Sequence, residues 1–235
     1  MTDSNSGTPR RRFIGQLAAT AVGLGAAGCA TSASASAVPS AGAAPVRARG
    51  QAFDDSWTRR LGSQHRFVFE AAQMASGPNV TDEVASLFDW YHTSLATNDQ
   101  DMHLVLVVRH AAIPMVFNDV LWSKYGIGED VALKSAGGEF LKANPYARKN
   151  APDKGGVVPA AHTIDALQER GVIVLACNMA AMFRAASYAR KTKADVKAVE
   201  QEVRENLLPG VILQVNGIYA VNRAQDAGCA YYKGG

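Results

Sequence analysis

In this 235-residue chain, Cys177 has the sequence setting that is most typical of a reactive side chain. It ends the apolar run VIVLAC at residues 172–177, and the small-residue run NMAAMFRAA at 178–186 follows at once. The amide N–H groups that open a helix favour a thiolate over a thiol, which makes a cysteine a better nucleophile. The pattern therefore predicts a nucleophilic, catalytic thiol at Cys177. The alternative is a small buried apolar residue, which is a common role for a free cysteine.

Other polar or flexible residues follow apolar runs that are typical of strands. We expect a substrate-binding set at the ends of these runs: Arg109, His110, Asn178, Asn216 and Gly217. Ligands of open parallel sheets bind at the carboxyl ends of the strands, where these residues and Cys177 would meet. Arg109 or His110 would steady an anionic substrate, a sulfur species or another anion, and Gly217 would let a ligand approach a helix N-terminus. The alternatives are a solvated strand end for Arg109 and His110 and a simple turn at Gly217.

The elements that must position these residues alternate along the chain. Short β-branched runs are separated by longer amphipathic segments, which favours an α/β fold with a mainly parallel sheet. We expect strands at residues 65–72, 103–108, 172–177, 211–216 and 229–233. Helices are expected at 81–96, from about 114, at 163–170, 179–189 and 193–210, and from 217. The Gly-, Lys- and Pro-rich segment 126–160 breaks the rhythm and is expected to be a functional flap or a partly disordered insertion.

The first 60 residues differ in composition from the rest. Arg10 and Arg11 precede a weakly apolar, Gly/Ala-rich run, so residues 1–37 resemble a twin-arginine (Tat) export signal. This predicts a protein of the periplasm or cell envelope. AAGC at Cys29 resembles a lipoprotein processing box, which would add a lipid anchor, whereas the Ala-Ser-Ala sequences at 33–37 suit soluble release. Residues 38–60 are expected to form a flexible linker and 61–235 a single domain.

Charge and cysteine content exclude several classes of protein. With 24 Lys and Arg against 21 Asp and Glu, the net charge of +3 does not predict nucleic-acid binding. Cys177 and Cys229 are expected to lie two strands apart, farther than the roughly 7 Å between Cα atoms that a disulfide allows. No spacing resembles a zinc motif, and neither a flavin phosphate loop nor G-x-G-x-x-G follows a strand. We therefore predict no metal and no cofactor.

Three stretches together resemble the DsrE-like (DsrE/DsrF sulfur-relay) family: GVIVLACNMAA, LLPGVILQVNGIYAVNRAQ and AGCAYYK. The resemblance covers most of residues 65–233. It implies a flavodoxin-like three-layer sandwich with a five-stranded parallel sheet of order 2-1-3-4-5, assembled as a trimer or hexamer. The chain departs from the family in having Cys177-Asn178-Met179 where many members have Cys-Gly-Asn, and in the added segment 126–160.

The resemblance also implies a function. In sulfur-relay members the cysteine that ends the third strand accepts sulfane sulfur as a persulfide and passes it to a partner thiol, and Cys177 occupies the matching position. The implied protein is an exported carrier or binder of sulfur compounds, with the Tat translocase and a sulfur donor or acceptor protein as partners. The alternative is an oligomeric binding or scaffold protein of the envelope without thiol chemistry, and whether the chain is an enzyme stays open.

Overall fold

The computed structural model of the chain describes residues 53–74 and 79–234. The expected export signal, Cys29 and residues 38–52 of the expected linker lie outside these described residues. Within them, no helix has both the length and the apolar character that crossing a membrane requires.

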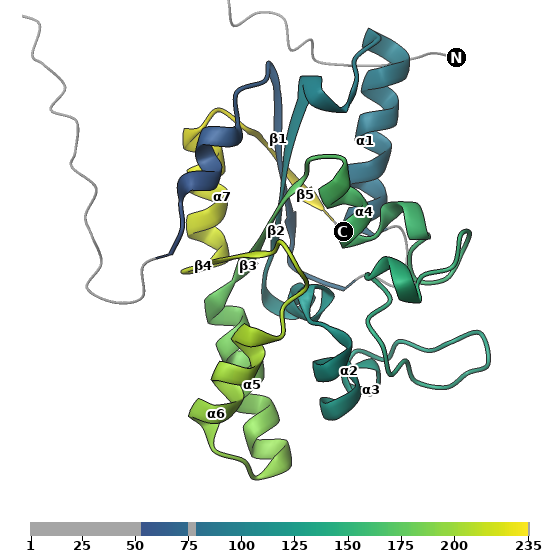
Figure 1. Ribbon diagram of the computed structural model, residues 1–235, viewed down its shortest axis with the longest axis vertical. Helices are drawn as coiled ribbons and strands as arrows, with labels where there is room; N and C mark the ends of the chain where they lie inside the picture. Colours follow the sequence, from purple (N-terminus) through teal and green to yellow (C-terminus); the bar gives the residue numbers. More distant parts are fainter. Residues whose placement is uncertain (1–52, 75–78, 235) are drawn as a thin grey trace, which may run out of the picture. The chain divides into compact units, whose positions relative to one another are not determined.

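Five parallel strands form one sheet at the centre of the fold (Figure 1). The strands are β1 (His65–Ala71), β2 (Met102–Val108), β3 (Ile173–Cys177), β4 (Ile212–Gln214) and β5 (Ala230–Gly234). All four neighbouring pairs run parallel, with Val105 opposite Ile173 and Cys177 opposite Gln214. The predicted α/β class and five-stranded parallel sheet are therefore confirmed.

The predicted strand order 2-1-3-4-5 is wrong. The observed order is β4-β3-β2-β1-β5, so that β2 occupies the centre and β4 and β5 form the edges. The reason lies in burial. The run LVLVV at 104–108 is buried throughout, whereas β1 begins with the half-buried His65 and Arg66. A strand that is apolar on both faces gains from neighbours on both sides and helices on both faces, and β3, which is buried throughout, also has a strand on each side.

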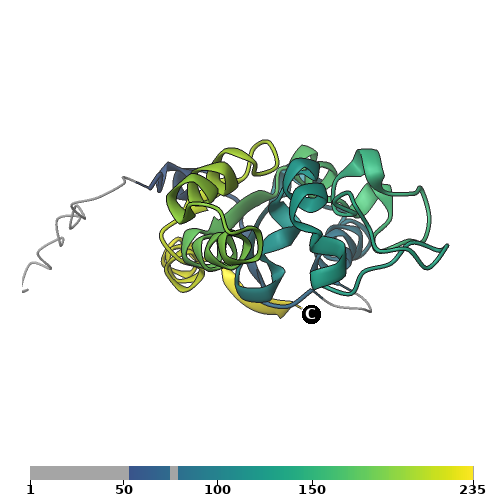
Figure 2. The ribbon, with the colours of Figure 1, turned by 90° about the horizontal axis from the view of Figure 1, so that it is seen from below.

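Helices and short 3₁₀ helices connect the strands and cover the sheet. The helices are α1 (Val80–Leu95), α2 (Asp119–Tyr125), α3 (Ile127–Asp130), α4 (Ile164–Glu169), α5 (Asn178–Thr192), α6 (Val196–Glu205) and α7 (Gly217–Asp226). The 3₁₀ helices are η1 (Ser56–Arg60), η2 (Asp99–Asp101), η3 (His110–Val116), η4 (Arg148–Asn150) and η5 (Ala160–His162). Seen from below, α5 and α6 lie side by side, with α2 and α3 next to them (Figure 2).

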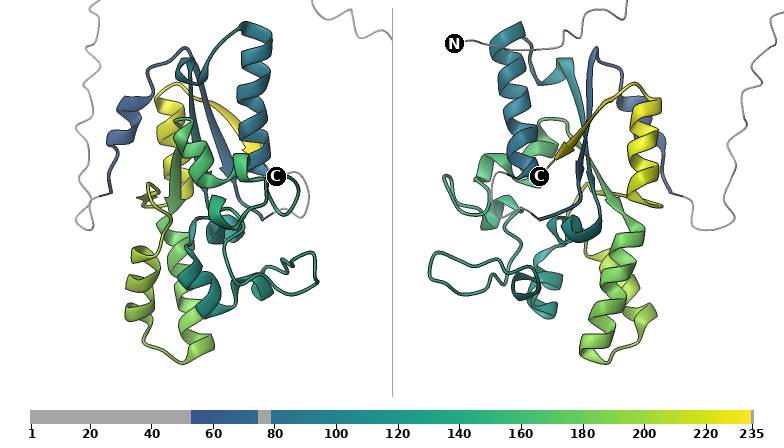
Figure 3. Two further views of the ribbon diagram at one scale, coloured as in Figure 1. Left: turned by 45° about the vertical axis from the view of Figure 1, so that its right-hand side comes forward. Right: turned by 180° about the vertical axis from the view of Figure 1, so that it is seen from behind.

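The side chains of each strand alternate between two hydrophobic cores, as the two-residue period of a strand requires. Leu106 and Val174 face the larger core, together with α1, α4, α5 and α6. Val105 and Leu175 face the smaller core, together with η1 and α7. Figure 3 shows α7 and η1 on one side of the sheet and α1 and α4 on the other. The fold is a three-layer arrangement in which α7 alone connects two strands on its face.

The folded part of the chain begins earlier than the expected boundary at residue 60. Trp57 in η1 is only 1% exposed and packs in the smaller core. The Asp54 carbonyl accepts a hydrogen bond from Gln214 Nε2 at 2.8 Å, and the Asp55 carboxylate accepts one from the Tyr219 hydroxyl. We call residues 53–61 the strap, because this segment ties β4 and α7 to the chain N-terminal to β1.

Segment 126–160 is anchored to the domain by buried residues, whereas its residues 134–140 are all exposed. Tyr146 and Val158 are buried in the larger core. Buried Asn144 donates to the carbonyls of Met115 and Phe117 at 2.8 and 2.6 Å, which fixes the segment to the turn before α2. Figure 1 shows the segment on the side of the sheet that carries α1 and α4. Buried apolar and amide groups hold the segment there. Its Gly- and Lys-rich composition does not predict these buried contacts.

Candidate functional site

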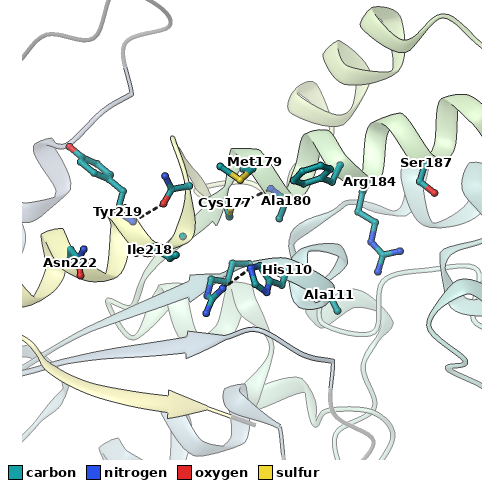
Figure 4. A pocket seen from close by; sticks show the side chains of 14 residues that line it. His110, Ala111, Cys177, Met179, Ala180, Arg184, Ser187, Ile218, Tyr219 and Asn222 are labelled. Carbon is teal, nitrogen blue, oxygen red and sulfur yellow. Dashed lines mark hydrogen bonds between the residues drawn. The ribbon is translucent and has the colours of Figure 1, made fainter.

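A pocket of about 860 Å³ opens at the carboxyl end of the sheet between α5 and α7 (Figure 4). The chain leaves β3 towards the face covered by α5, and it leaves the neighbouring β4 towards the opposite face and α7. Ligands of α/β sheets bind where adjacent strands diverge in this way. This point lies between β3 and β4, and not between β1 and β3 as the predicted strand order required.

The pocket contains five of the six residues that the sequence singled out. Its lining is formed by Arg109, His110, Ala111, Cys177, Met179, Ala180, Phe183, Arg184, Ser187, Asn216, Gly217, Ile218, Tyr219 and Asn222. Figure 4 shows Cys177 and Ala180 at the start of α5, Tyr219 and Asn222 on α7, and His110 on the segment after β2, around a common space.

Cys177 lines the pocket where β3 becomes α5. It is the N-cap of α5, and its Sγ accepts a hydrogen bond from the amide of Ala180 at 3.3 Å. The residue is 4% exposed, so only a small part of its surface contacts solvent. A sulfur that accepts a backbone N–H at a helix N-terminus is suited to carry negative charge.

Arg109 and His110 form the side of the pocket that follows β2. The Arg109 Nε–H donates to Glu70 Oε1, and Arg109 Nη1 lies 2.7 Å from His110 Nε2. The other Glu70 oxygen accepts a hydrogen bond from the Tyr231 hydroxyl, and this contact together with burial raises the pKa of Tyr231. His110 has a φ of 49°, a left-handed conformation that few non-glycine residues adopt. The contacts of Arg109 and this local backbone geometry fix both side chains at the pocket.

Asn216, Gly217 and Tyr219 form the opposite side. Asn216 caps α7 by accepting the amide N–H of Tyr219 on Oδ1 at 2.8 Å. The Tyr219 hydroxyl is held by Asp55 of the strap, and that hydrogen bond, together with burial, raises the pKa of Tyr219. Gly217 is buried against the Arg109 side chain: a Cβ atom there would lie 2.6 Å from Arg109 Cδ and 2.7 Å from Arg109 Cβ. Gly217 thus permits the contact between the two sides.

We expect Gly217→Ala to displace Arg109. The helix tolerates alanine at this position, so the cost arises from the contact with Arg109 and should be about 1–3 kcal/mol, as for other overpacked sites. Urea unfolding measures the loss of stability, and an altered His110 ring signal in NMR spectra reports the movement of its neighbour. Gly62→Ala is the matched control, because a Cβ atom at Gly62 meets nothing within 4 Å. Equal stabilities of the two variants would contradict this account.

Asn178 and Cys229 lie outside the pocket. Asn178 is not among the lining residues; its Oδ1 accepts a hydrogen bond from Arg204 Nε of α6 at 3.3 Å. The expected substrate contact at Asn178 stays a prediction, since the side chain faces α6 and not the pocket. Cys229 is a free, buried thiol in the smaller core, just before β5. Two strands, β2 and β1, separate β5 from β3.

We expect the folded protein to lose stability in alkali because of Cys229. Burial raises the pKa of its thiol from about 9 to about 11, and the nearby Arg66 charge opposes the shift. Between these values the unfolded chain releases the proton while the folded chain keeps it. The stabilisation is therefore complete below about pH 9 and is lost as the pH rises through 11. Urea unfolding over this range should give a flatter pH dependence for Cys229→Ala than for the native sequence, and identical slopes would refute the assignment.

Several pocket residues escape sequence analysis. Met179, Phe183 and Ile218 are 52%, 71% and 63% exposed, although all three are large and apolar. Arg184 and Ser187 share the face of α5 that carries Cys177 and Ala180. The three- and four-residue spacing of 177, 180, 184 and 187 is a signal for this face, but only the packing of α5 on the sheet shows that it borders a pocket.

The basic residues of segment 126–160 do not reach this site. Lys142, Arg148 and Lys149 are not among the lining residues; Arg148 pairs with Glu169 at 2.7 Å and Lys149 with Asp119 at 2.7 Å. These two contacts are ordinary surface ion pairs. Among residues 53–74 and 79–234, no three His, Cys, Asp or Glu side chains are arranged to hold a metal ion.

Comparisons with known proteins give one distant structural likeness. No family model and no curated protein matches the chain. The fold is similar to a solved structure of MTH1491, a protein of unknown function from Methanobacterium thermoautotrophicum, with 14% sequence identity and a TM-score of 0.37. The match covers 72% of this chain and 98% of that one. Neither a ligand nor an activity follows from a likeness of this degree.

Proposed function

We propose that this protein binds a sulfur compound in the pocket and accepts its sulfane sulfur on Cys177. The observation that carries the proposal is the position of Cys177: the sulfur lines the pocket where β3 and β4 diverge, and it accepts a helix N-terminal amide. The resemblance of GVIVLACNMAA to the DsrE-like family supports the same role. Cys229 is less suited to it, because it lies in the smaller core outside the pocket and burial raises the pKa of its thiol.

The transfer is balanced without an added oxidant. The Cys177 thiolate attacks the outer sulfur of a donor persulfide, R–S–SH. The S–S bond of the donor breaks as a new S–S bond to Cys177 forms, and R–S⁻ leaves and takes up the proton that the Cys177 thiol has released. An acceptor thiolate then removes the outer sulfur from Cys177 by the same exchange. The Ala180 amide stabilises the Cys177 thiolate that attacks the donor and that the second step regenerates.

A second function is favoured by one observation. Cys177 is only 4% exposed, as expected for a small core residue beside a pocket that binds a ligand without reacting. The chain would then be a binding or scaffold protein. The two functions differ in whether the Cys177 sulfur is accessible to a reagent.

The proposal includes a place in the cell and an assembly. The Arg10-Arg11 signal supports Tat export to the cell envelope, and the family resemblance supports a trimer or hexamer that meets a donor or acceptor protein there. Fractionation of the source cells and light scattering of the purified chain test these two points. A monomer recovered from the cytoplasm with its first 37 residues intact would contradict both.

Peptide mapping tests the sulfur transfer. The reduced protein is treated with inorganic polysulfide, blocked with an alkylating reagent and digested, and the two cysteine peptides are compared by mass spectrometry. One added sulfur on the Cys177 peptide, and none on the Cys229 peptide, is the expected result. Absence of added sulfur at Cys177 would favour the binding protein.

A further inference from the structure

The ionisable side chains that line the pocket include basic groups but no carboxylate. The lining contains two guanidinium groups, Arg109 and Arg184, and the imidazole of His110, but no Asp or Glu. Glu70 pairs with Arg109 and balances its charge. Arg184 is different: in the described parts of the chain, no carboxylate lies within ion-pair distance of it. Arg184 therefore supplies an uncompensated positive charge that favours an anion in the pocket.

The sequence positions of Arg184 and Cys177 set the distance between these two residues along α5. Arg184 lies seven positions after Cys177 in the sequence. The two residues therefore occupy the same face of α5, two turns apart. A rise of 1.5 Å per residue puts them about 10 Å apart along the helix axis. Ala180 lies between them and is small enough to leave that face open.

Large apolar side chains form another part of the pocket wall. Phe183 and Met179 border the pocket from α5 and Ile218 borders it from α7, and each exposes more than half of its surface. A single exposed apolar residue is normal, but three large ones around one pocket mark a binding surface. The pocket volume of about 860 Å³ suits an organic molecule, since ligand sites span about 300–1,000 Å³.

We infer that the ligand of this pocket is a small amphipathic organic anion. Its acid group pairs with Arg184, its apolar chain or ring lies against Met179, Phe183 and Ile218, and its other end reaches Cys177. This inference rests on the proposed function only at the Cys177 end, where the ligand would carry its sulfur. Inorganic sulfide would leave most of the pocket empty, and an ammonium-bearing ligand would meet the charge of Arg184.

Calorimetry with ligands of equal chain length tests the inference. Octanoate and octylammonium each have eight carbons in an unbranched chain, and they carry opposite charges. Titration into Cys177→Ser avoids any thiol reaction. Octanoate should bind at least tenfold more tightly than octylammonium. Arg184→Gln in the same background should weaken octanoate binding about tenfold and leave octylammonium binding no weaker, whereas Phe183→Ala should weaken both.

Arg190→Gln is the matched control, because Arg190 is an exposed arginine of α5 outside the pocket lining. Equal affinities for the two ligands, or equal effects of Arg184→Gln and Arg190→Gln, would overturn the inference. The proposed function fails separately: octanoate binding without sulfur uptake at Cys177 retains the ligand class and removes the sulfur chemistry. Sulfur uptake at Cys177 without octanoate binding would retain the sulfur chemistry and overturn the proposed ligand class.

Discussion

Cys177→Ser is expected to abolish persulfide formation while the protein stays folded. The serine hydroxyl has nearly the shape of the thiol and can accept the Ala180 amide in its place, so α5 keeps its cap. Unlike a cysteine, the serine cannot form an S–S bond with the donor, so no sulfur can be held at this position. The measurement is the amount of protein-bound sulfane sulfur after treatment with polysulfide, with circular dichroism as the check on folding.

The control for Cys177→Ser is Cys229→Ser, which removes the other cysteine of the described chain. Cys229 is buried in the smaller core, outside the pocket, so its replacement should leave sulfur uptake unchanged. Undiminished uptake by the Cys177→Ser variant would sink the sulfur-transfer proposal. Uptake that falls equally in both variants would place the sulfur on a bridge between the cysteines, which the strands between β3 and β5 make geometrically implausible.

The sequence predicts the strands well because their signals are local. Apolar runs at 103–108 and 172–177 become β2 and β3 with changes of no more than one residue at either end. The order of the strands depends on contacts between distant segments, which the resemblance supplied incorrectly. One local signal agrees with the observed order: the two most apolar runs, 103–108 and 172–177, became β2 and β3, and each of these has a strand on both sides.

The residues of the site also divide into those that local signals predict and those that depend on contacts between distant segments. Arg109, Cys177 and Asn216 meet at one pocket because every parallel strand ends at the same edge, whatever the order of the strands. The positions of Arg184 and Ile218 depend on how α5 and α7 are rotated against the sheet, which the sequence does not specify. Asn178 lies outside the pocket lining, and its side chain contacts Arg204 of α6, a contact between distant segments that the sequence does not specify.

Trp57→Ala is expected to destabilise the protein by about 3–5 kcal/mol, the usual cost of removing a large aromatic side chain from a core. Trp57 is 1% exposed and packs with Leu61 and the residues of β2, β3 and α7 that form the smaller core. Urea unfolding measures the loss. Trp90→Ala is the matched control, because Trp90 is 63% exposed on α1 and its removal should cost less than about 0.5 kcal/mol.

The same variant connects the strap to the site. Asp55 of the strap holds the Tyr219 hydroxyl and lies 3.4 Å from Arg223, and both partners are on α7. Without Trp57 the strap loses its main apolar contact, and the start of α7 loses the support that keeps Tyr219 and Asn216 at the pocket. We therefore expect Trp57→Ala to weaken octanoate binding at urea concentrations far below its unfolding midpoint, although Trp57 does not line the pocket. Unchanged binding together with the full loss of stability would show that α7 keeps its position without the strap.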